Sequence, residues 1–203
     1  MTIYDLKPKF QNLLRPITRW LAAHHFTANQ VTLAACALSF LVGALVAAWA
    51  FDGRIFLLLP GVLFVRMALN AIDGMLAREH GQKSRLGAIL NELTDVASDA
   101  ALYLPFALLP ETEPVLVVVL VFLAMLTEMT GVLGTVVGAS RRYDGPMGKS
   151  DRAFVFGFLG LLLGLGVPLQ PYLNYVWGVL IVLLSRTVYN RASRALNEGA
   201  PRV

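Results

Sequence analysis

Long apolar segments separated by short polar turns fill most of the chain after its first 30 residues. Six such segments lie at about 31–51, 55–76, 88–109, 114–137, 153–169 and 172–190. A helix needs about 20 residues to cross the hydrocarbon core of a bilayer, and each segment is close to that length. Helices satisfy their own backbone hydrogen bonds in lipid. The pattern therefore predicts an all-α integral membrane protein with six transmembrane helices.

A different periodicity precedes the first apolar segment. Between residues 5 and 22, apolar side chains recur at helical spacing, whereas Lys9, Arg15 and Arg19 lie mainly on other faces. This arrangement is typical of an amphipathic helix that lies in the membrane interface. We interpret it as a juxtamembrane anchor, with a role in gating or lipid entry as the alternative. We expect the whole chain, residues 1–203, to form a single membrane domain.

The distribution of basic residues predicts the orientation of this domain. Lys and Arg residues precede the first apolar segment and follow the second, fourth and sixth, and the opposite loops carry only Arg54 together with the acidic stretch 111–113. By the positive-inside rule, both termini and the turn after the second segment face the cytosol. The first 30 residues are too polar for a cleaved signal peptide. We expect a multi-pass membrane protein, and the family resemblance described below implies a bacterial inner membrane.

Composition supports the membrane assignment and excludes several other classes. Hydrophobic residues make up 57% of the chain and charged residues 15%, with a mean hydropathy of +0.64. These values are typical of a membrane protein rather than of a soluble domain. Cys36, the lone cysteine, lies in an apolar segment, which excludes a disulfide framework and a cysteine metal site. The net charge of +4 is modest, and we expect no nucleic-acid partner.

One polar stretch, residues 70–99, joins the second and third apolar segments. Polar side chains recur there at helical spacing on either side of a glycine-containing turn: Arg66, Asn70 and Asp73, then Asn91, Asp95, Ser98 and Asp99. An antiparallel hairpin would place these two stripes opposite each other near one membrane surface. Carboxylates and amides are costly at membrane depth, so the stripes indicate a functional site.

The spacing within this stretch resembles the signature of the CDP-alcohol phosphotransferase family, D-x2-D-G-x2-A-R-x8-G-x3-D-x3-D. The letters match at Asp73, Gly74, Ala77, Arg78, Gly87 and Asp95. They differ at Asn70 and Asn91, where the family has its first and third aspartates. Six spans with the motif between the second and third also resemble this family, so the resemblance covers the whole chain.

The resemblance implies an enzyme of phospholipid biosynthesis. Family members transfer a phosphatidyl group from a CDP-linked lipid such as CDP-diacylglycerol to an alcohol hydroxyl and release CMP. The resemblance also implies Mg²⁺ or Mn²⁺ as cofactor, membrane lipids as surroundings and a homodimer as assembly. Oxygen ligands suit these cations, which neutralise pyrophosphate charge during substitution at phosphorus.

The resemblance further assigns roles to the motif residues. The metal positions are Asn70, Asp73, Asn91 and Asp95, and Asp95 is also the catalytic base for the incoming hydroxyl. Substrate-binding positions carried by the same motif are Gly74, Ala77, Arg78 and Gly87. The two glycines let a nucleotide and its phosphates approach the backbone closely.

Two further segments resemble parts of the family pattern. The first, TANQVT at residues 27–32, resembles T-P-N-x-x-T, and this resemblance implies that Asn29 and Thr32 bind substrate. A helix N-cap at Thr27 is an equally good explanation of the segment. The second starts at Gly148 and resembles G-K-x-x-T. Its Lys149 and Arg152 either bind a phosphate or carboxylate of the acceptor or serve only as cytosolic charges.

Several alternatives remain open in the sequence. The neutral Asn70 and Asn91 leave fewer charges for a metal, so the chain could instead be a degenerate member that binds a CDP-lipid or a partner without turnover. Asp99 is either a substitute metal ligand or a buried acid paired with Arg66. Glu128, within the fourth apolar segment, either lines the acceptor cavity or pairs with Arg66. A small transporter is disfavoured because the chain shows no repeated, broken helices.

Overall fold

The computed structural model describes residues 3–199, with side chains for residues 8–198, and this part of the chain contains helices and no strands. The elements in order are α1 (Ile3–Ala23), α2 (Ala28–Ala48), η1 (Gly53–Leu57), α3 (Leu58–Glu79), α4 (Arg85–Tyr103), η2 (Leu104–Leu108), α5 (Pro114–Val136), α6 (Lys149–Gly164) and α7 (Gln170–Gly199). The predicted all-α fold class is confirmed.

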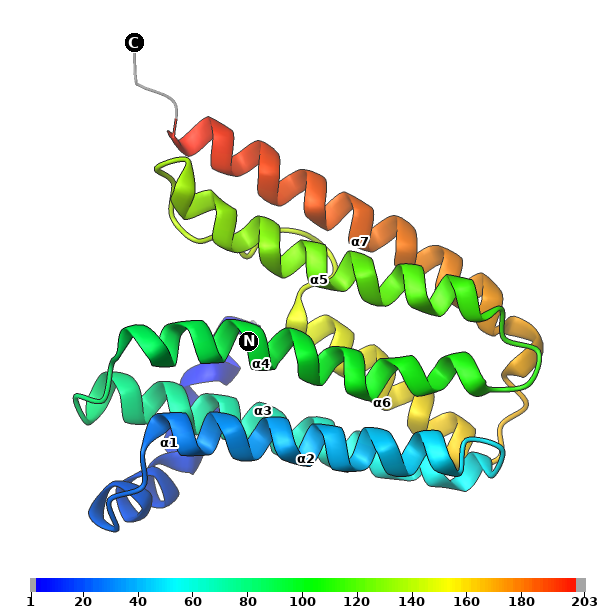
Figure 1. Cartoon of the computed structure of the whole chain (residues 1–203), viewed down its shortest axis with the longest axis horizontal. Helices are drawn as coiled ribbons and strands as arrows, with labels where there is room; N and C mark the ends of the chain where they lie inside the picture. The colour runs from blue at the N-terminus through cyan, green and yellow to red at the C-terminus, as the bar shows by residue number, and fades with distance from the viewer. Residues whose placement is uncertain (1–2, 200–203) are drawn as a thin grey trace.

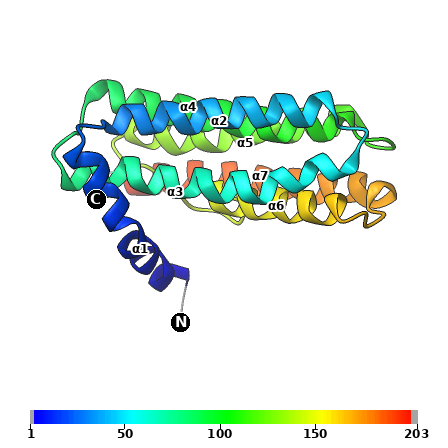
Figure 2. The same cartoon turned by 90° about the horizontal axis from the view of Figure 1, so that it is seen from below.

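Six long helices form a bundle of two layers. Seen edge-on in Figure 2, α2, α4 and α5 lie in one layer and α3, α6 and α7 in the other. Helix α2 contacts both α3 and α4, while α5 contacts α7 and α3 contacts α6. Figure 1 shows the α5–α7 pair diverging from the α2–α4 pair at the end where α4 begins. The bundle is therefore closed at one end and open at the other.

Local capping explains where two of these helices begin. The Thr27 hydroxyl accepts a hydrogen bond from the Gln30 backbone N–H, and the Gln30 side chain accepts from the Thr27 N–H, which completes a capping box for α2. The Ser84 hydroxyl caps α4 by accepting from the Gly87 N–H. The turn between α3 and α4 is tied to the start of α2 because the Gln82 side chain accepts from the Ala28 N–H at 2.6 Å.

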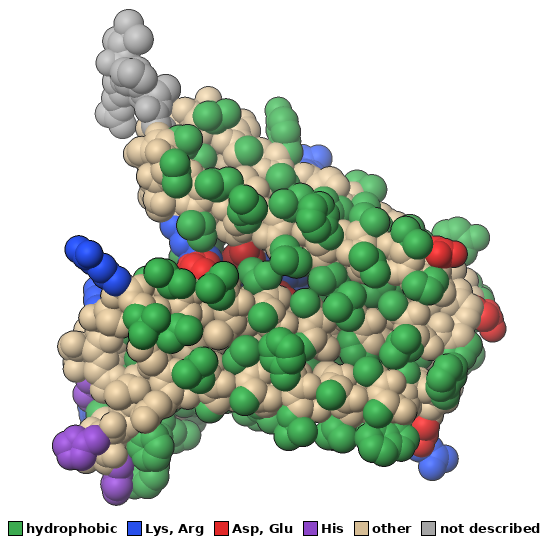
Figure 3. All heavy atoms as spheres, viewed as in Figure 1, with side chains coloured by type: hydrophobic (Ala, Val, Ile, Leu, Met, Phe, Trp, Pro, Cys, Tyr) green, Lys and Arg blue, Asp and Glu red, His purple; other side chains and the backbone are tan. Residues whose placement is uncertain are grey.

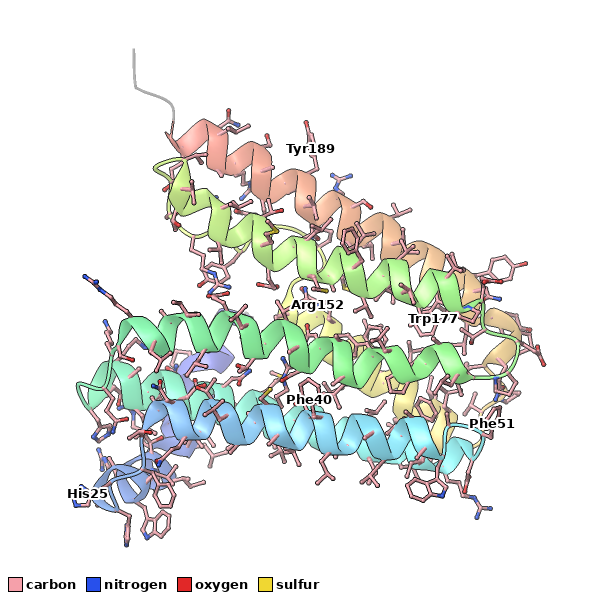
Figure 4. The ribbon with its side chains drawn as sticks, viewed as in Figure 1. His25, Phe40, Phe51, Arg152, Trp177 and Tyr189 are labelled. Carbon is pink, nitrogen blue, oxygen red and sulfur yellow. The ribbon has the colours of Figure 1, made fainter. Side chains whose placement is uncertain are left out.

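An aromatic cluster fills the closed end of the bundle. The rings of Tyr103 and Phe156 stack with centroids 3.8 Å apart, and Phe106 and Trp177 lie edge-on to each other at 5.7 Å. Figure 4 places Trp177 well away from Arg152, which lies near the start of α6. Aromatic pairs add to the stabilisation that burial of their large apolar surfaces provides. This end holds the helices together by apolar packing.

Large apolar side chains also cover the outside of the bundle, as the space-filling view shows (Figure 3). Four segments of the described chain are long and apolar enough to cross a membrane: Ala28–Ala48, Gly53–Glu79, Pro114–Val136 and Gln170–Glu198. Helix α4 carries several charged side chains, and α6 has only 16 residues. The integral membrane character predicted from the sequence is confirmed, whereas the count of six crossings stays a prediction.

Helix α1 occupies the segment predicted to be amphipathic and packs on α3. Its Leu14 is buried against α3 residues such as Met75, whereas Leu13 and Trp20 on its other side are 72% and 55% exposed. Figure 2 shows α1 projecting obliquely from the bundle. An exposed apolar face on a projecting helix is what an interfacial anchor requires, and that location stays a prediction.

Candidate active site

A pocket of about 1040 Å³ opens between α4 and the diverging α5–α7 pair. Residues of α2, α3, α4, α5, α6 and α7 line it together with the α3–α4 turn and the loop between α5 and α6. In Figure 3 the molecule is hollowed there, and acidic and basic side chains gather in the hollow. Asn70, Asp73, Asn91 and Asp95 of the two predicted polar stripes thus line one cavity, whereas Arg66, Ser98 and Asp99 do not line it.

Asp73 of α3 and Asp95 of α4 are the carboxylates of the family motif, and both line the pocket. Asp73 is only 5% exposed, and its Oδ2 accepts a hydrogen bond from the Thr32 hydroxyl at 2.7 Å. Asp95 is more accessible, and its Oδ2 lies 2.5 Å from the Lys149 ammonium nitrogen. The two acids therefore differ in their partners, because Asp73 is bound by a neutral hydroxyl and Asp95 by a cation.

Asn70 and Asn91 lie beside these acids on the same two helices and also line the pocket. The Asn70 amide nitrogen donates to Asp95 Oδ1 at 3.2 Å. Within residues 3–199 no group of three or more His, Cys, Asp or Glu side chains is arranged to hold a metal. A Mg²⁺ ion is commonly held by one or two carboxylates and completed by substrate phosphates. Two carboxylates flanked by amide oxygens fit that requirement.

Two glycines allow close approaches in the pocket wall. A Cβ atom at position 87 would lie 2.7 Å from the Asn29 Oδ1 atom and 3.0 Å from the Ser84 hydroxyl. A Cβ atom at position 74 would lie 2.9 Å from a guanidinium nitrogen of Arg78. Glycine at each position therefore leaves room for a polar side chain that lines the pocket.

Three helices begin at the pocket, and the first residue of each lines it: Ala28 of α2, Arg85 of α4 and Lys149 of α6. The N-terminus of a helix carries a partial positive charge and presents backbone N–H groups, so it attracts anions. Arg78 and Lys83 add side-chain charges to the same wall. The arrangement is suited to a ligand with several negative charges.

A network of buried ion pairs lies behind the pocket. Asp99 binds Arg66 at 2.5 Å through Oδ1 and Arg152 at 2.9 Å through Oδ2. Arg152 is 1% exposed and also binds Glu128 Oε1 at 2.9 Å. Arg191 of α7 lies 3.4 Å from the other Glu128 oxygen. The network joins α3, α4, α5, α6 and α7 at the point where the bundle opens.

This network decides two alternatives that the sequence left open. Both Asp99 oxygens are held by guanidinium groups, so the structure favours the ion-pair interpretation of Asp99 over a metal-ligand role. Glu128 does line the pocket, but its ion-pair partners are Arg141, Arg152 and Arg191 rather than Arg66. Buried charges of this kind are stable only when they are paired and hydrogen-bonded.

The loop between α5 and α6 supplies a pocket wall that sequence reasoning missed. Arg141 lines the pocket, forms an ion pair with Glu92 of α4 and lies 4.8 Å from the centroid of the Tyr143 ring. Asp144 ties the loop to α7 through Arg194. Helical spacing could not find these contacts, because Arg141 lies outside the helices and was interpreted only as a charge that sets topology.

The pKa of Asp144 reflects these anchors. Partial burial alone would raise it, but the guanidinium groups of Arg142 and Arg194 donate hydrogen bonds to the carboxylate and outweigh that effect. The pKa of Asp144 therefore lies below its usual range. The carboxylate is charged at neutral pH and holds the loop in place.

Most of the residues predicted from the sequence lie together. The predicted positions that line the pocket are Asn29, Thr32, Asn70, Asp73, Gly74, Ala77, Arg78, Gly87, Asn91, Asp95 and Lys149. Arg152 is the exception, because it lies behind the pocket lining and binds Asp99 and Glu128. A side chain that is 1% exposed and held by two acids is not placed to bind an acceptor from solution. The prediction that Arg152 contacts substrate is therefore not supported by its position.

Comparison with known proteins identifies a family and two relatives of this chain, one of which matches it over nearly its whole length. Residues 25–191 match the family described as CDP-alcohol phosphatidyltransferase. The chain is 52% identical over 200 residues to the inner membrane protein YnbA of Escherichia coli K12, a match that covers 98% of this chain and 99% of the relative. It is 34% identical over 103 residues to an archaetidylinositol phosphate synthase of Pyrococcus horikoshii, which covers 51% and 52% of the two chains.

Solved structures with a similar fold are phosphatidylinositol phosphate synthases (PgsA1) of Mycobacterium tuberculosis. The structure in complex with manganese and citrate is 21% identical and has a TM-score of 0.74, over 93% of this chain and 92% of the other. The structure with CDP-DAG bound is 18% identical and has a TM-score of 0.67, over 91% and 92%. At these identities the likeness concerns the fold.

Proposed function

The chain belongs to the CDP-alcohol phosphatidyltransferase family, and on this premise we propose that it transfers a substituted phosphate group from a CDP-linked lipid to an alcohol hydroxyl. CMP is the leaving group, and the product is a phospholipid or its precursor. The observation that carries the proposal is the pocket, where two motif carboxylates meet three helix N-termini. CDP-diacylglycerol is the donor we favour, because the relative with a similar fold binds CDP-DAG.

The donor binds through its phosphates and nucleotide. Backbone N–H groups at the starts of α2, α4 and α6 and the side chains of Arg78 and Lys83 attract the pyrophosphate. Gly87 leaves room for the Asn29 amide, and this amide lines the part of the pocket where we expect the nucleotide to bind. The acyl chains stay in the bilayer against the apolar outer faces of the helices.

Asp95 acts as the general base. Its carboxylate removes the proton of the acceptor hydroxyl while the hydroxyl oxygen forms a bond to the donor's β-phosphorus. The bond from that phosphorus to the oxygen bridging to CMP breaks, and CMP leaves with the bond's electron pair. Arg66 donates to the Asp95 backbone carbonyl at 2.8 Å and fixes the turn of α4 that carries the base. Lys149 faces the same carboxylate and the incoming phosphates.

A divalent cation, Mg²⁺ or Mn²⁺, completes the site. Asp73 is placed to hold it, and the amides of Asn70 and Asn91 and the carboxylate of Asp95 line the same pocket. When bound, the cation neutralises negative charge on the pyrophosphate. Thr32 keeps Asp73 oriented by donating a hydrogen bond to it.

The acceptor enters from the side formed by α7 and the loop between α5 and α6. Arg141 and Lys149 are among the cations on that side, so an alcohol that carries a phosphate or carboxylate is the acceptor class we favour. We propose that the protein works as a multi-pass protein of the inner membrane, with the pocket and both termini in the cytosol, and that it forms a homodimer.

Release of CMP tests this function. Purified protein receives CDP-diacylglycerol, Mg²⁺ or Mn²⁺ and a panel of alcohols, and a typical family member is assayed in parallel. We expect CMP with at least one alcohol and none after addition of a chelator. If no alcohol and no metal supports release while the reference enzyme is active, the enzyme hypothesis is wrong.

A second function is favoured by one specific observation, the neutral Asn70 and Asn91 at metal positions. It is a degenerate member that binds a CDP-lipid without turnover. The Asn70→Asp/Asn91→Asp variant discriminates between the two functions. A variant that gains CMP release over an inactive parent supports the degenerate binder, whereas a variant that loses activity supports an enzyme tuned to its amides.

A further inference from the structure

The charges around Asp95 are already balanced within the protein. Its Oδ2 lies 2.5 Å from the Lys149 ammonium, and its Oδ1 lies 3.5 Å from an Arg66 guanidinium nitrogen and accepts from Asn70. Both oxygens thus have cationic or amide partners from the chain itself. Asp73, by contrast, has no ion-pair partner among the described residues, and its Oδ2 accepts a hydrogen bond from the neutral Thr32 hydroxyl.

Lys149 is held in this position by its own helix. The first turn of α6 is closed by Asp151, which accepts from the Gly148 N–H at 2.9 Å. Three residues after Lys149, Arg152 binds Asp99, which lies one helical turn beyond Asp95 on α4. Two basic residues of α6 therefore bind two successive acids of α4. This pairing fixes the ammonium against Asp95, whereas an exposed loop lysine would be free to move.

The balance of charge limits how many cations the site can take. Asn70 and Asn91 contribute amide oxygens without charge, so the four motif positions carry two negative charges. A divalent cation bound to Asp95 would lie beside the Lys149 ammonium and be repelled by it. A divalent cation at Asp73 meets no such charge in direct contact.

We propose that the Lys149 ammonium is a permanent counter-charge for Asp95 and takes the place of a second divalent cation in the site. The site then holds one divalent cation, centred on Asp73, when the nucleotide is bound. Lys149 neutralises the phosphate nearest Asp95, and the cation neutralises the other. This inference rests on the proposed function, because it concerns how the same pocket handles the donor's charge.

The number of bound cations tests the proposal without any turnover. Full-length protein in detergent or nanodiscs is mixed with saturating CDP and titrated with Mn²⁺, and the free ion is measured by electron paramagnetic resonance. We expect one Mn²⁺ per chain for the native protein. The triple variant Asn70→Asp/Asn91→Asp/Lys149→Gln restores two carboxylates and removes the ammonium, and we expect it to bind two.

The affinity for CDP at saturating Mn²⁺ tests Lys149 separately, by titration calorimetry. Lys149→Gln should weaken CDP binding about tenfold or more, while Lys149→Arg, which keeps the charge, should weaken it less than about threefold. Lys9→Gln makes the same change of charge on an exposed residue of α1 and should bind CDP as the native protein does. Thermal melting shows whether each variant is folded.

Two results overturn the proposal. One is two Mn²⁺ ions, or none, per chain of the native protein with CDP present. The other is a folded Lys149→Gln variant that binds CDP as tightly as Lys9→Gln. If Lys149→Gln does not fold, the native stoichiometry and Lys149→Arg still decide. CMP release is measured on the same preparation to separate this inference from the proposed function. An active enzyme that binds two cations would contradict the inference but not the function.

Discussion

Helices α4 and α6 bind each other differently at successive levels. Nearest the open end, Asp95 pairs with Lys149; one turn deeper, Asp99 pairs with Arg152. One further turn along each helix, Tyr103 stacks on Phe156 with ring centroids 3.8 Å apart. Within two turns the same two helices pass from a partly exposed ion pair to a buried one and then to an aromatic pair.

The comparison separates stability from positioning. An aromatic pair adds about 0.5–1.5 kcal/mol to what its buried area contributes, and other apolar side chains could supply much of this. A buried ion pair contributes little net free energy, but removal of one partner costs about 3–5 kcal/mol because the other charge is left unpaired. The aromatic level therefore holds the bundle together, and the ionic levels fix which side chains face the pocket.

The largest effect is expected at the level nearest the pocket. Asp95→Asn keeps the shape of the side chain and removes the base, so CMP release should fall by about 10²–10⁴-fold while the melting temperature changes little. Asp52→Asn is the matched control, because Asp52 caps η1 at the far end and asparagine caps as well as aspartate. Turnover that persists in Asp95→Asn would remove Asp95 as the base.

The buried ionic level should respond through stability. Arg152→Met removes the partner that Asp99 and Glu128 share, and we expect a loss of about 3–5 kcal/mol in the free energy of unfolding. Denaturation of the detergent-solubilised protein measures this. A variant as stable as the native protein would mean that Arg66, Arg141 and Arg191 suffice for the two acids.

The aromatic level should tolerate change best where shape is roughly kept. Phe156→Leu loses the stacking on Tyr103 and some buried area, so we expect a loss of about 1–2 kcal/mol. CMP release per folded molecule should be unchanged, because neither Tyr103 nor Phe156 lines the pocket. A lower turnover in folded Phe156→Leu would contradict the separation of the two roles.

The smallest effect concerns Asp144, which anchors the pocket loop from outside the helices. The pKa of Asp144 is lower in the folded protein than in the unfolded chain, where it is about 4. The charged carboxylate therefore stabilises the loop at pH values above about 4, and this contribution is lost as the pH falls through the pKa of the folded state. Because Arg194 is 65% exposed, the contribution is below about 1 kcal/mol. Asp144→Asn should speed amide hydrogen exchange in residues 137–148 at pH 7 and leave melting nearly unchanged. Exchange equal to that of the native loop would contradict this role.

The sequence predicted the helices because apolar segments and polar turns alternate so clearly. It missed some boundaries for local reasons. The segment predicted at 88–109 divides into α4 and η2, where Pro105 cannot donate a helical hydrogen bond. Helix α6 starts at Lys149 rather than at 153, because Asp151 binds the Gly148 N–H and closes the first turn. Each of these features depends on a single side chain, and hydropathy averaged over a whole segment does not show it.

The motif spacing likewise predicted which residues of α3 and α4 share the pocket, since helical geometry converts spacing into a face. It could not place Arg152, because spacing along a chain does not say which acid on another helix a long side chain reaches. It also missed Arg141 and Arg191, which enter the pocket from a loop and from α7. The roles assigned to Asn70 and Asn91 stay predictions.

The buried arginine of α6 has a consequence for how the protein is made. Helix α6 is 16 residues long and begins with Lys149, Asp151 and Arg152, so it is a poor substrate for insertion on its own. The acids that pair with Arg152, Asp99 and Glu128, lie on α4 and α5, which leave the ribosome first. We therefore predict an order of biogenesis, in which α4 and α5 are in place before α6 packs against them and Arg152 is buried.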